Sequence, residues 1–228
     1  MSTEEIIEIE TRPGETQGSV IWLHGLGADG HDFEAIVPEL WSPSEPGLRF
    51  VFPHAPMRPV TINGGMKMRA WFDILSLDRD GLADEAGVRA SAEILENLIQ
   101  RELERGIDAS KIVVAGFSQG GAIALHAALR SQQKLAGLMA LSTYMPLASA
   151  FEDEVLGTNA VDPRELPIFM AHGTFDPVLP MELGRESADL LIASGFDVEW
   201  HDYPMAHAVC AAEIDDIRRW LQTIYAFE

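Results

Sequence analysis

The sequence of 228 residues is poor in cysteine and in basic side chains. Its single cysteine, Cys210, excludes a disulfide framework within the chain, so no oxidising compartment is implied. Only 16 Lys and Arg residues stand against 36 Asp and Glu residues, which gives a formal net charge of −20. A surface this acidic repels phosphate groups, so nucleic acids and anionic membranes are poor partners.

Long hydrophobic runs, repeats and low-complexity linkers are also missing. No apolar run is long enough to span a bilayer, and residues 1–5 carry neither the positive nor the apolar region of a signal peptide. We therefore expect no stable membrane insertion and a cytoplasmic location. An apolar fraction of 47% is ordinary for a globular protein, and the length suits one domain over residues 1–228.

Strand-like and helix-like segments alternate along the whole chain. Apolar and β-branched runs predict strands at 6–10, 19–23, 48–52, 111–115, 135–142, 167–171 and 197–203. Helical spacing predicts helices at 32–40, 84–105, 118–130, 180–194 and 213–225. This alternation predicts an α/β fold with a doubly wound, mainly parallel sheet and helices on both faces. Ligands of such sheets bind beyond the carboxyl ends of the strands.

Residues 116–120, Gly-Phe-Ser-Gln-Gly, have the pattern G-x-S-x-G. A buried strand is predicted directly before them and a helix of small residues directly after. Strand, sharp turn and helix form the context of a nucleophile elbow, in which a strained turn exposes the hydroxyl of the central serine, here Ser118. A turn without chemistry is the alternative, but it leaves the partner residues described below unexplained.

A glycine-rich loop at residues 24–30 also follows a predicted buried strand. It lacks the lysine of a phosphate-binding P-loop and does not have the pattern G-x-G-x-x-G. In a fold with a nucleophile elbow, a loop at this place donates a backbone N–H to an oxyanion hole. Leu26 is the best candidate donor, with Gln119 as the second, and His24 is expected to order the loop.

The stretch around 54–81 is predicted to be an irregular insertion on the substrate side. It carries bulky apolar side chains on a long loop, among them Met66, Trp71 and Phe72. These side chains either bind substrate or fill a small core beneath the loop, and the sequence does not separate the two. Tyr144, after the strand at 135–142, is expected to line the site from its far side.

A serine hydroxyl needs a base to remove its proton, and a carboxylate to hold that base in the right tautomer. Asp176 and His207 follow Ser118 in the order Ser, Asp, His, and each lies in a loop just after a predicted strand. The remaining histidines lie before Asp176 or, for His201, within a strand. We therefore expect Ser118, Asp176 and His207 to form a catalytic triad.

Further motifs surround these residues over nearly the whole chain, at 20–27, 52–56, 61–65, 68–74, 116–122, 142–144, 172–173, 176–178 and 203–205. Through them the sequence resembles the phospholipase/carboxylesterase family of α/β-hydrolases, which includes carboxylesterases and acyl-protein thioesterases. The resemblance implies the same triad and oxyanion donors, a substrate contact at Val178, and a reaction that needs no metal or organic cofactor. One departure is Ala206, where the family usually has glycine.

The expected function is therefore that of a serine carboxylic ester hydrolase, which acts on small acyl esters or thioesters through an acyl-enzyme. The alternatives are an acyl-protein thioesterase or a lysophospholipase, which act on longer chains. A non-catalytic binding protein should have lost a triad member, and a dienelactone-type hydrolase should have cysteine at position 118. The resemblance also allows a homodimer.

Overall fold

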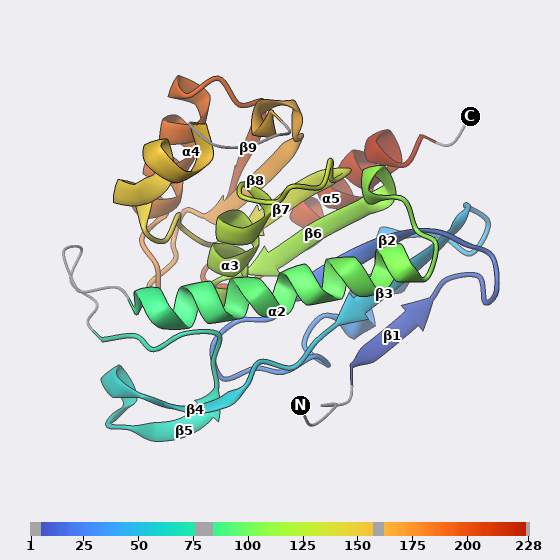
Figure 1. Ribbon diagram of the computed structural model, residues 1–228. Helices are drawn as coiled ribbons and strands as arrows, with labels where there is room; N and C mark the ends of the chain where they lie inside the picture. The colour runs from blue at the N-terminus through green and yellow to red at the C-terminus, as the bar shows by residue number, and fades with distance from the viewer. Residues whose placement is uncertain (1–5, 76–83, 157–161, 227–228) are drawn as a thin grey trace.

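A twisted seven-stranded sheet forms the centre of the computed structural model, which describes residues 6–75, 84–156 and 162–226 (Figure 1). The strand order is β1-β3-β2-β6-β7-β8-β9, and only β1 runs antiparallel to its neighbour. The strands are β1 (Ile7–Glu10), β2 (Thr16–Leu23), β3 (Gly47–Phe52), β6 (Ile112–Phe117), β7 (Gly137–Leu141), β8 (Ile168–Gly173) and β9 (Val198–Tyr203). The predicted mainly parallel sheet is thus confirmed.

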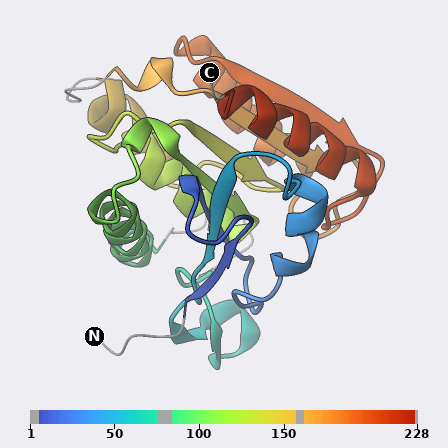
Figure 2. The same cartoon turned by 90° about the vertical axis from the view of Figure 1, so that its right-hand side faces the viewer.

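Helices cover both faces of the sheet, as Figure 2 shows. One face carries α2 (Glu85–Glu104), α3 (Gln119–Ala128) and α4 (Met181–Ala193), and the other carries α1 (Val37–Leu40) and α5 (Ala211–Ile224). The central strand β6 explains why both faces must be covered. All six of its residues are buried, with Ile112 and Val114 in one core and Val113 and Ala115 in the other.

The carboxyl ends of the central strands lie level with one another. Leu23 at the end of β2 pairs with Gly116, and Phe117 at the end of β6 pairs with Leu141. The chain reverses its direction of strand addition between β2 and β6, which is where parallel sheets open a crevice for ligands. The loops after β2, β6, β8 and β9 therefore open toward one edge of the sheet.

Two segments differ from the sequence-based expectation. The helix expected at 32–40 is a 3₁₀ turn at Glu34–Ile36 followed by the single turn of α1. The insertion expected to be irregular contains an antiparallel hairpin of β4 (Met57–Val60) and β5 (Met66–Arg69). Gly64 and Gly65 turn this hairpin with φ angles of 66° and 76°, a region that favours glycine. The end of the insertion, at 76–81, lies outside the described residues.

Candidate active site

Ser118 lies on a sharp turn between β6 and α3. Its φ of 54° and ψ of −121° are rarely adopted by a residue with a side chain, so the turn is strained. A Cβ atom at Gly116 would lie 2.4 Å from the backbone of Gly120, and one at Gly120 would lie 2.4 Å from the carbonyl of Leu23. The two glycines of the pattern are therefore required by the close approach of β6, α3 and β2.

The backbone of Ser118 is held from the neighbouring strand β7. Its N–H donates to the carbonyl of Leu141 at 2.8 Å, and its own carbonyl accepts from the Thr143 hydroxyl at 2.7 Å. These bonds fix the strained turn at both of its peptide groups. The Ser118 hydroxyl is thereby held at the amino end of α3, where the helix dipole stabilises negative charge.

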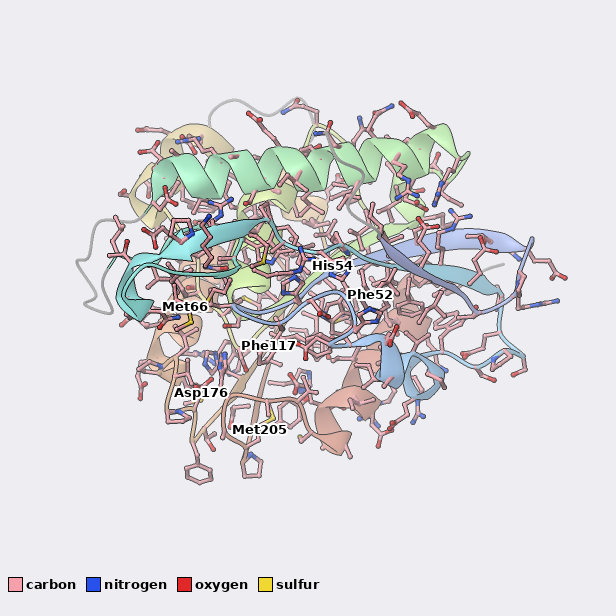
Figure 3. All side chains as sticks on the ribbon, turned by 90° about the horizontal axis from the view of Figure 1, so that it is seen from below. Phe52, His54, Met66, Phe117, Asp176 and Met205 are labelled. Carbon is pink, nitrogen blue, oxygen red and sulfur yellow. The ribbon has the colours of Figure 1, made fainter. Side chains whose placement is uncertain are left out.

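The structure brings Ser118, His207 and Asp176 into one hydrogen-bonded row. Nε2 of His207 lies 2.9 Å from Oγ of Ser118, and Nδ1 of His207 lies 2.6 Å from Oδ2 of Asp176. Phe117 packs against the His207 ring at a centroid distance of 4.8 Å. Figure 3 labels Phe117, Asp176 and Met205, which come from β6 and from the loops after β8 and β9 and lie near one another in the lower part of that view.

The Asp176 carboxylate is wholly buried and well supplied with donors. Its Oδ1 accepts the backbone N–H groups of Val178 at 2.8 Å and Leu179 at 2.9 Å, which leaves Oδ2 for His207. Nε2 of His172 lies 3.5 Å from the same Oδ2 and 2.9 Å from the carbonyl of Leu179. Burial lowers the pKa of His172, so this ring is neutral beside the carboxylate.

The loops that carry Asp176 and His207 are joined to each other through their backbones. The N–H of Thr174 donates to the carbonyl of Tyr203 at 2.8 Å, and the N–H of Phe175 donates to the carbonyl of Met205 at 3.1 Å. A Cβ atom at Gly173 would lie 2.4 Å from the carbonyl oxygen of Ala206. The two loops therefore meet at a distance that only glycine at position 173 permits.

Ala206 is the position at which the sequence departs from the family pattern. Within the described part of the chain, positive φ angles at non-glycine residues occur at Ser118, Ser142 and Leu147, and Ala206 is not among them. An alanine methyl is therefore compatible with the loop, and His207 still reaches both of its partners.

Of the two predicted oxyanion donors, Gln119 directly follows Ser118, and Leu26 follows Gly25, where a Cβ atom would lie 3.4 Å from Cβ of Ser118. The N–H groups of Leu26 and Gln119 make no hydrogen bond to any residue within 6–75, 84–156 and 162–226. The loop before Leu26 is ordered by His24, as expected. Burial lowers the pKa of His24 to about 4, so its neutral ring accepts the N–H of Ala55 at 3.0 Å and donates to the carbonyl of Gly25 at 2.7 Å.

The predicted substrate contacts divide into two groups. Trp71 and Phe72 are buried in the core cluster that includes residues of α2 and α3, as the core alternative predicts, and their contact with substrate stays a prediction. Met66 and Val178 are 64% and 60% exposed, and Tyr144 is half-buried. Phe175, which is 70% exposed beside Asp176, is an apolar side chain that the sequence analysis missed, although its place in the Asp176 loop was visible.

The described residues contain no group of three or more His, Cys, Asp and Glu side chains that could hold a metal ion. None of their helices is both long and apolar enough to cross a bilayer. The hydroxyl–imidazole–carboxylate row itself defines a chemistry that this site can perform. A neutral His207 that donates from Nδ1 to Asp176 presents a lone pair to the Ser118 hydroxyl and can accept its proton.

Comparison with known proteins shows the family of this chain. The model of the family described as Phospholipase/Carboxylesterase matches residues 4–225. The chain is 42% identical over 211 residues to the Neurospora crassa protein named acyl-protein thioesterase 1, with 89% of this chain and 85% of that protein covered. The relative of the same name from Gibberella zeae is 41% identical over 212 residues, with 90% and 89% covered.

A solved structure has the same arrangement of elements. The crystal structure of Zea mays acyl-protein thioesterase 2 superimposes with a TM-score of 0.85 at 27% sequence identity. The match covers 96% of this chain and 98% of that one, so the shared fold extends over the whole molecule.

Proposed function

Because the chain belongs to the phospholipase/carboxylesterase family of α/β-hydrolases, which makes it a hydrolase of ester and thioester bonds, we propose that Ser118, His207 and Asp176 are its catalytic triad. The observation that carries the proposal is the unbroken row of two hydrogen bonds, 2.9 Å and 2.6 Å long, that joins the three side chains. Its members come from three different loops, and simple core packing gives no reason for them to meet.

The first half of the reaction forms an acyl-enzyme. Oγ of Ser118 attacks the acyl carbon while Nε2 of His207 accepts the hydroxyl proton, and the carbonyl oxygen becomes an oxyanion. The free N–H groups of Leu26 and Gln119 bind that oxyanion, each worth roughly 3 kcal/mol of transition-state stabilisation by analogy with other oxyanion holes. The bond to the leaving group then breaks, and His207 gives its proton to the departing thiol or alcohol.

The second half repeats these steps with water. His207 accepts a proton from water, the hydroxide attacks the acyl carbon, and the Ser118 oxygen leaves as it regains the proton from His207. Asp176 keeps Nδ1 of His207 protonated through both halves and stabilises the imidazolium that forms each time. Its second oxygen is occupied by the N–H groups of Val178 and Leu179, which fixes the carboxylate in this orientation.

The preferred substrate is an acyl thioester carried by a protein. The relatives at about 40% identity are named for this activity, which moves thioesters ahead of the small carboxylic esters expected first from the sequence. Exposed apolar side chains on either side of Asp176, those of Phe175 and Val178, offer an apolar surface for an acyl chain. An acidic protein with a net charge of −20 also favours a basic acylated peptide over an anionic one.

The test compares kcat/KM for thioesters and oxyesters of the same acyl groups over a series of chain lengths, with Ser118→Ala as the blank. We expect activity to hold or rise with chain length and thioesters to be cleaved faster than the matched oxyesters. A rate that peaks at short oxyesters would make the protein a general carboxylesterase. Equal activity on lysophospholipids would point to a lysophospholipase, and turnover by Ser118→Ala would reject the triad.

A cytoplasmic location and a homodimer remain predictions. The single cysteine, Cys210, suits a reducing compartment. Light scattering after size exclusion gives the oligomeric state directly, and a monomer at assay concentration would reject the dimer.

A further inference from the structure

Residues 69–72 begin at the last residue of β5. They make hydrogen bonds to both of the segments that carry the predicted oxyanion donors, the loop at 24–27 and the start of α3. Two of these bonds go to the Gln119 side chain, and two go to the loop at 24–27. After Arg69, residues 70–72 lead from the β4–β5 hairpin toward α2. The segment 69–72 therefore makes hydrogen bonds to both of the regions that carry the predicted donors.

Gln119 is bound to this segment at both ends of its side-chain amide. Its Oε1 accepts the backbone N–H of Trp71 at 2.7 Å, and its Nε2 donates to the carbonyl of Phe72 at 2.8 Å. A backbone N–H must meet an acceptor and a carbonyl must meet a donor, so the orientation of the amide is fixed. The first residue of α3 is thus tied to a segment 48 residues away in sequence.

The loop at 24–27 is held on both sides of Leu26. The indole Nε1–H of Trp71 donates to the carbonyl of His24 at 2.9 Å, and the N–H of Gly27 donates to the carbonyl of Arg69 at 2.9 Å. Between these two anchors, the Leu26 N–H is left without a partner among the described residues and is available to a ligand.

Burial makes these bonds strong positional constraints. The exposed fractions of Trp71, His24 and Gln119 are 0%, 2% and 4%, so water cannot replace a bond that is lost. A buried donor or acceptor left unpaired is costly, so the loops hold the geometry in which all of these groups are satisfied.

We propose that the side chains of Trp71 and Gln119 are positioning residues that set the separation and orientation of the Leu26 and Gln119 N–H groups in the oxyanion hole. The proposal rests on the proposed function, because it assumes that an oxyanion forms at Ser118. Its consequence is specific. Preorganised donors act on charge that develops in the transition state, so loosening them should lower kcat and leave KM almost unchanged.

The test uses Trp71→Phe, which removes the indole N–H, and Gln119→Met, which keeps the length of the side chain and loses both of its hydrogen bonds. Trp22→Phe is the matched control. Trp22 is also fully buried, but its indole N–H has no partner among the described residues, and it packs on the opposite face of the sheet. The control makes the same loss of volume without breaking a hydrogen bond.

The specific readout is the inhibition constant of a trifluoromethyl ketone. When this ketone binds, the Ser118 oxygen adds to its carbonyl carbon, the proton moves to His207, and the carbonyl oxygen becomes an oxyanion in the hole. We expect Trp71→Phe and Gln119→Met each to lower kcat by about 10- to 100-fold, with KM changed less than about twofold and ketone affinity reduced by a similar factor as kcat. The double variant should lose less than the product of the single losses, since both changes release the same segment.

Several outcomes would overturn the proposal. These are a rise in KM with kcat and ketone affinity unchanged, a loss that only follows the fraction of folded protein, or an equal loss in Trp22→Phe. If Trp71→Phe does not fold, Gln119→Met alone decides the question. Failure of the proposed function is recognised separately, because a fluorophosphonate would then not label Ser118 in the unaltered protein.

Discussion

Glu213 lies in the first turn of α5, six residues after His207, and its side chain is wholly buried. No Lys, Arg or His of the described residues forms an ion pair with it. Burial raises the pKa of this carboxyl to about 8, with a smaller contribution from the nearby Asp216. The perturbation that we consider is Glu213→Gln, which keeps the shape of the side chain and removes its proton equilibrium.

The sign of the effect follows from the two pKa values. The unfolded chain has an ordinary glutamate with a pKa near 4.5, so between pH 4.5 and 8 the folded protein holds a proton that the unfolded chain has lost. The free energy of unfolding must then fall as the pH rises through this window. Between pH 5 and pH 7.5 the fall attributable to Glu213 is at most about 3 kcal/mol, which Glu213→Gln should abolish.

The assay is urea unfolding of the unaltered protein and of Glu213→Gln at pH 5, 6, 7 and 7.5. The quantity compared at each pH is the difference between their free energies of unfolding. Other groups contribute to each profile, among them His24 and His126, whose pKa values burial lowers to about 4. They act equally in both proteins and cancel in the difference. Asp215→Asn, at an exposed site on the same helix, is the control for a simple loss of charge. Parallel profiles for Glu213→Gln and the unaltered protein would refute the reasoning.

Three further predictions concern the site. Ser118→Ala should abolish turnover while the thermal unfolding midpoint stays close to that of the unaltered protein; measurable turnover would remove Ser118 from its role. Asp176→Asn should lower kcat by about 10⁴-fold because the amide no longer holds His207 in the tautomer with a protonated Nδ1. An unchanged kcat in the same assay would point to another carboxylate. Gly173→Ala should lower kcat by about 100-fold, because its methyl group would meet the carbonyl of Ala206 and displace His207. The control, Ala206→Gly, should change kcat less than about twofold, since Ala206 is not in a conformation that needs glycine. A normal rate in Gly173→Ala would mean that the His207 loop can shift without consequence.

The sequence predicted that Ser118, Asp176 and His207 would come together because each of them has a local signature. Ser118 lies in a strand–turn–helix pattern, and Asp176 and His207 each follow a strand whose apolar residues are evident. Parallel strands end at a common edge, so these local patterns were sufficient to bring distant residues together. The approximate limits of the sheet strands and of the long helices followed from the same patterns.

The features that the sequence did not predict depend on contacts between segments that are distant in the chain. The hairpin of β4 and β5 escaped detection because Pro59 is unusual within a strand, although the alternation of Met66, Lys67, Met68 and Arg69 around a two-glycine turn was a usable signal. Burial of Trp71 was one of two alternatives between which the sequence did not decide, because its hydrogen-bond partners, His24 and Gln119, are distant in the chain. The hydrogen bonds of the Gln119 side chain to Trp71 and Phe72 could not be predicted for the same reason.

The backbone bonds between the Asp176 and His207 loops also bear on how this protein can be engineered. Thr174 and Phe175 form main-chain hydrogen bonds with Tyr203 and Met205, whereas the hydrogen bond between Ser118 and His207 joins two side chains. Residues 168–207, with β8, α4 and β9, therefore form one segment that carries both Asp176 and His207. A chimaera that exchanges the whole segment keeps their alignment, and one that exchanges a single loop separates them. Grafts between relatives should cut before residue 168 and after residue 207.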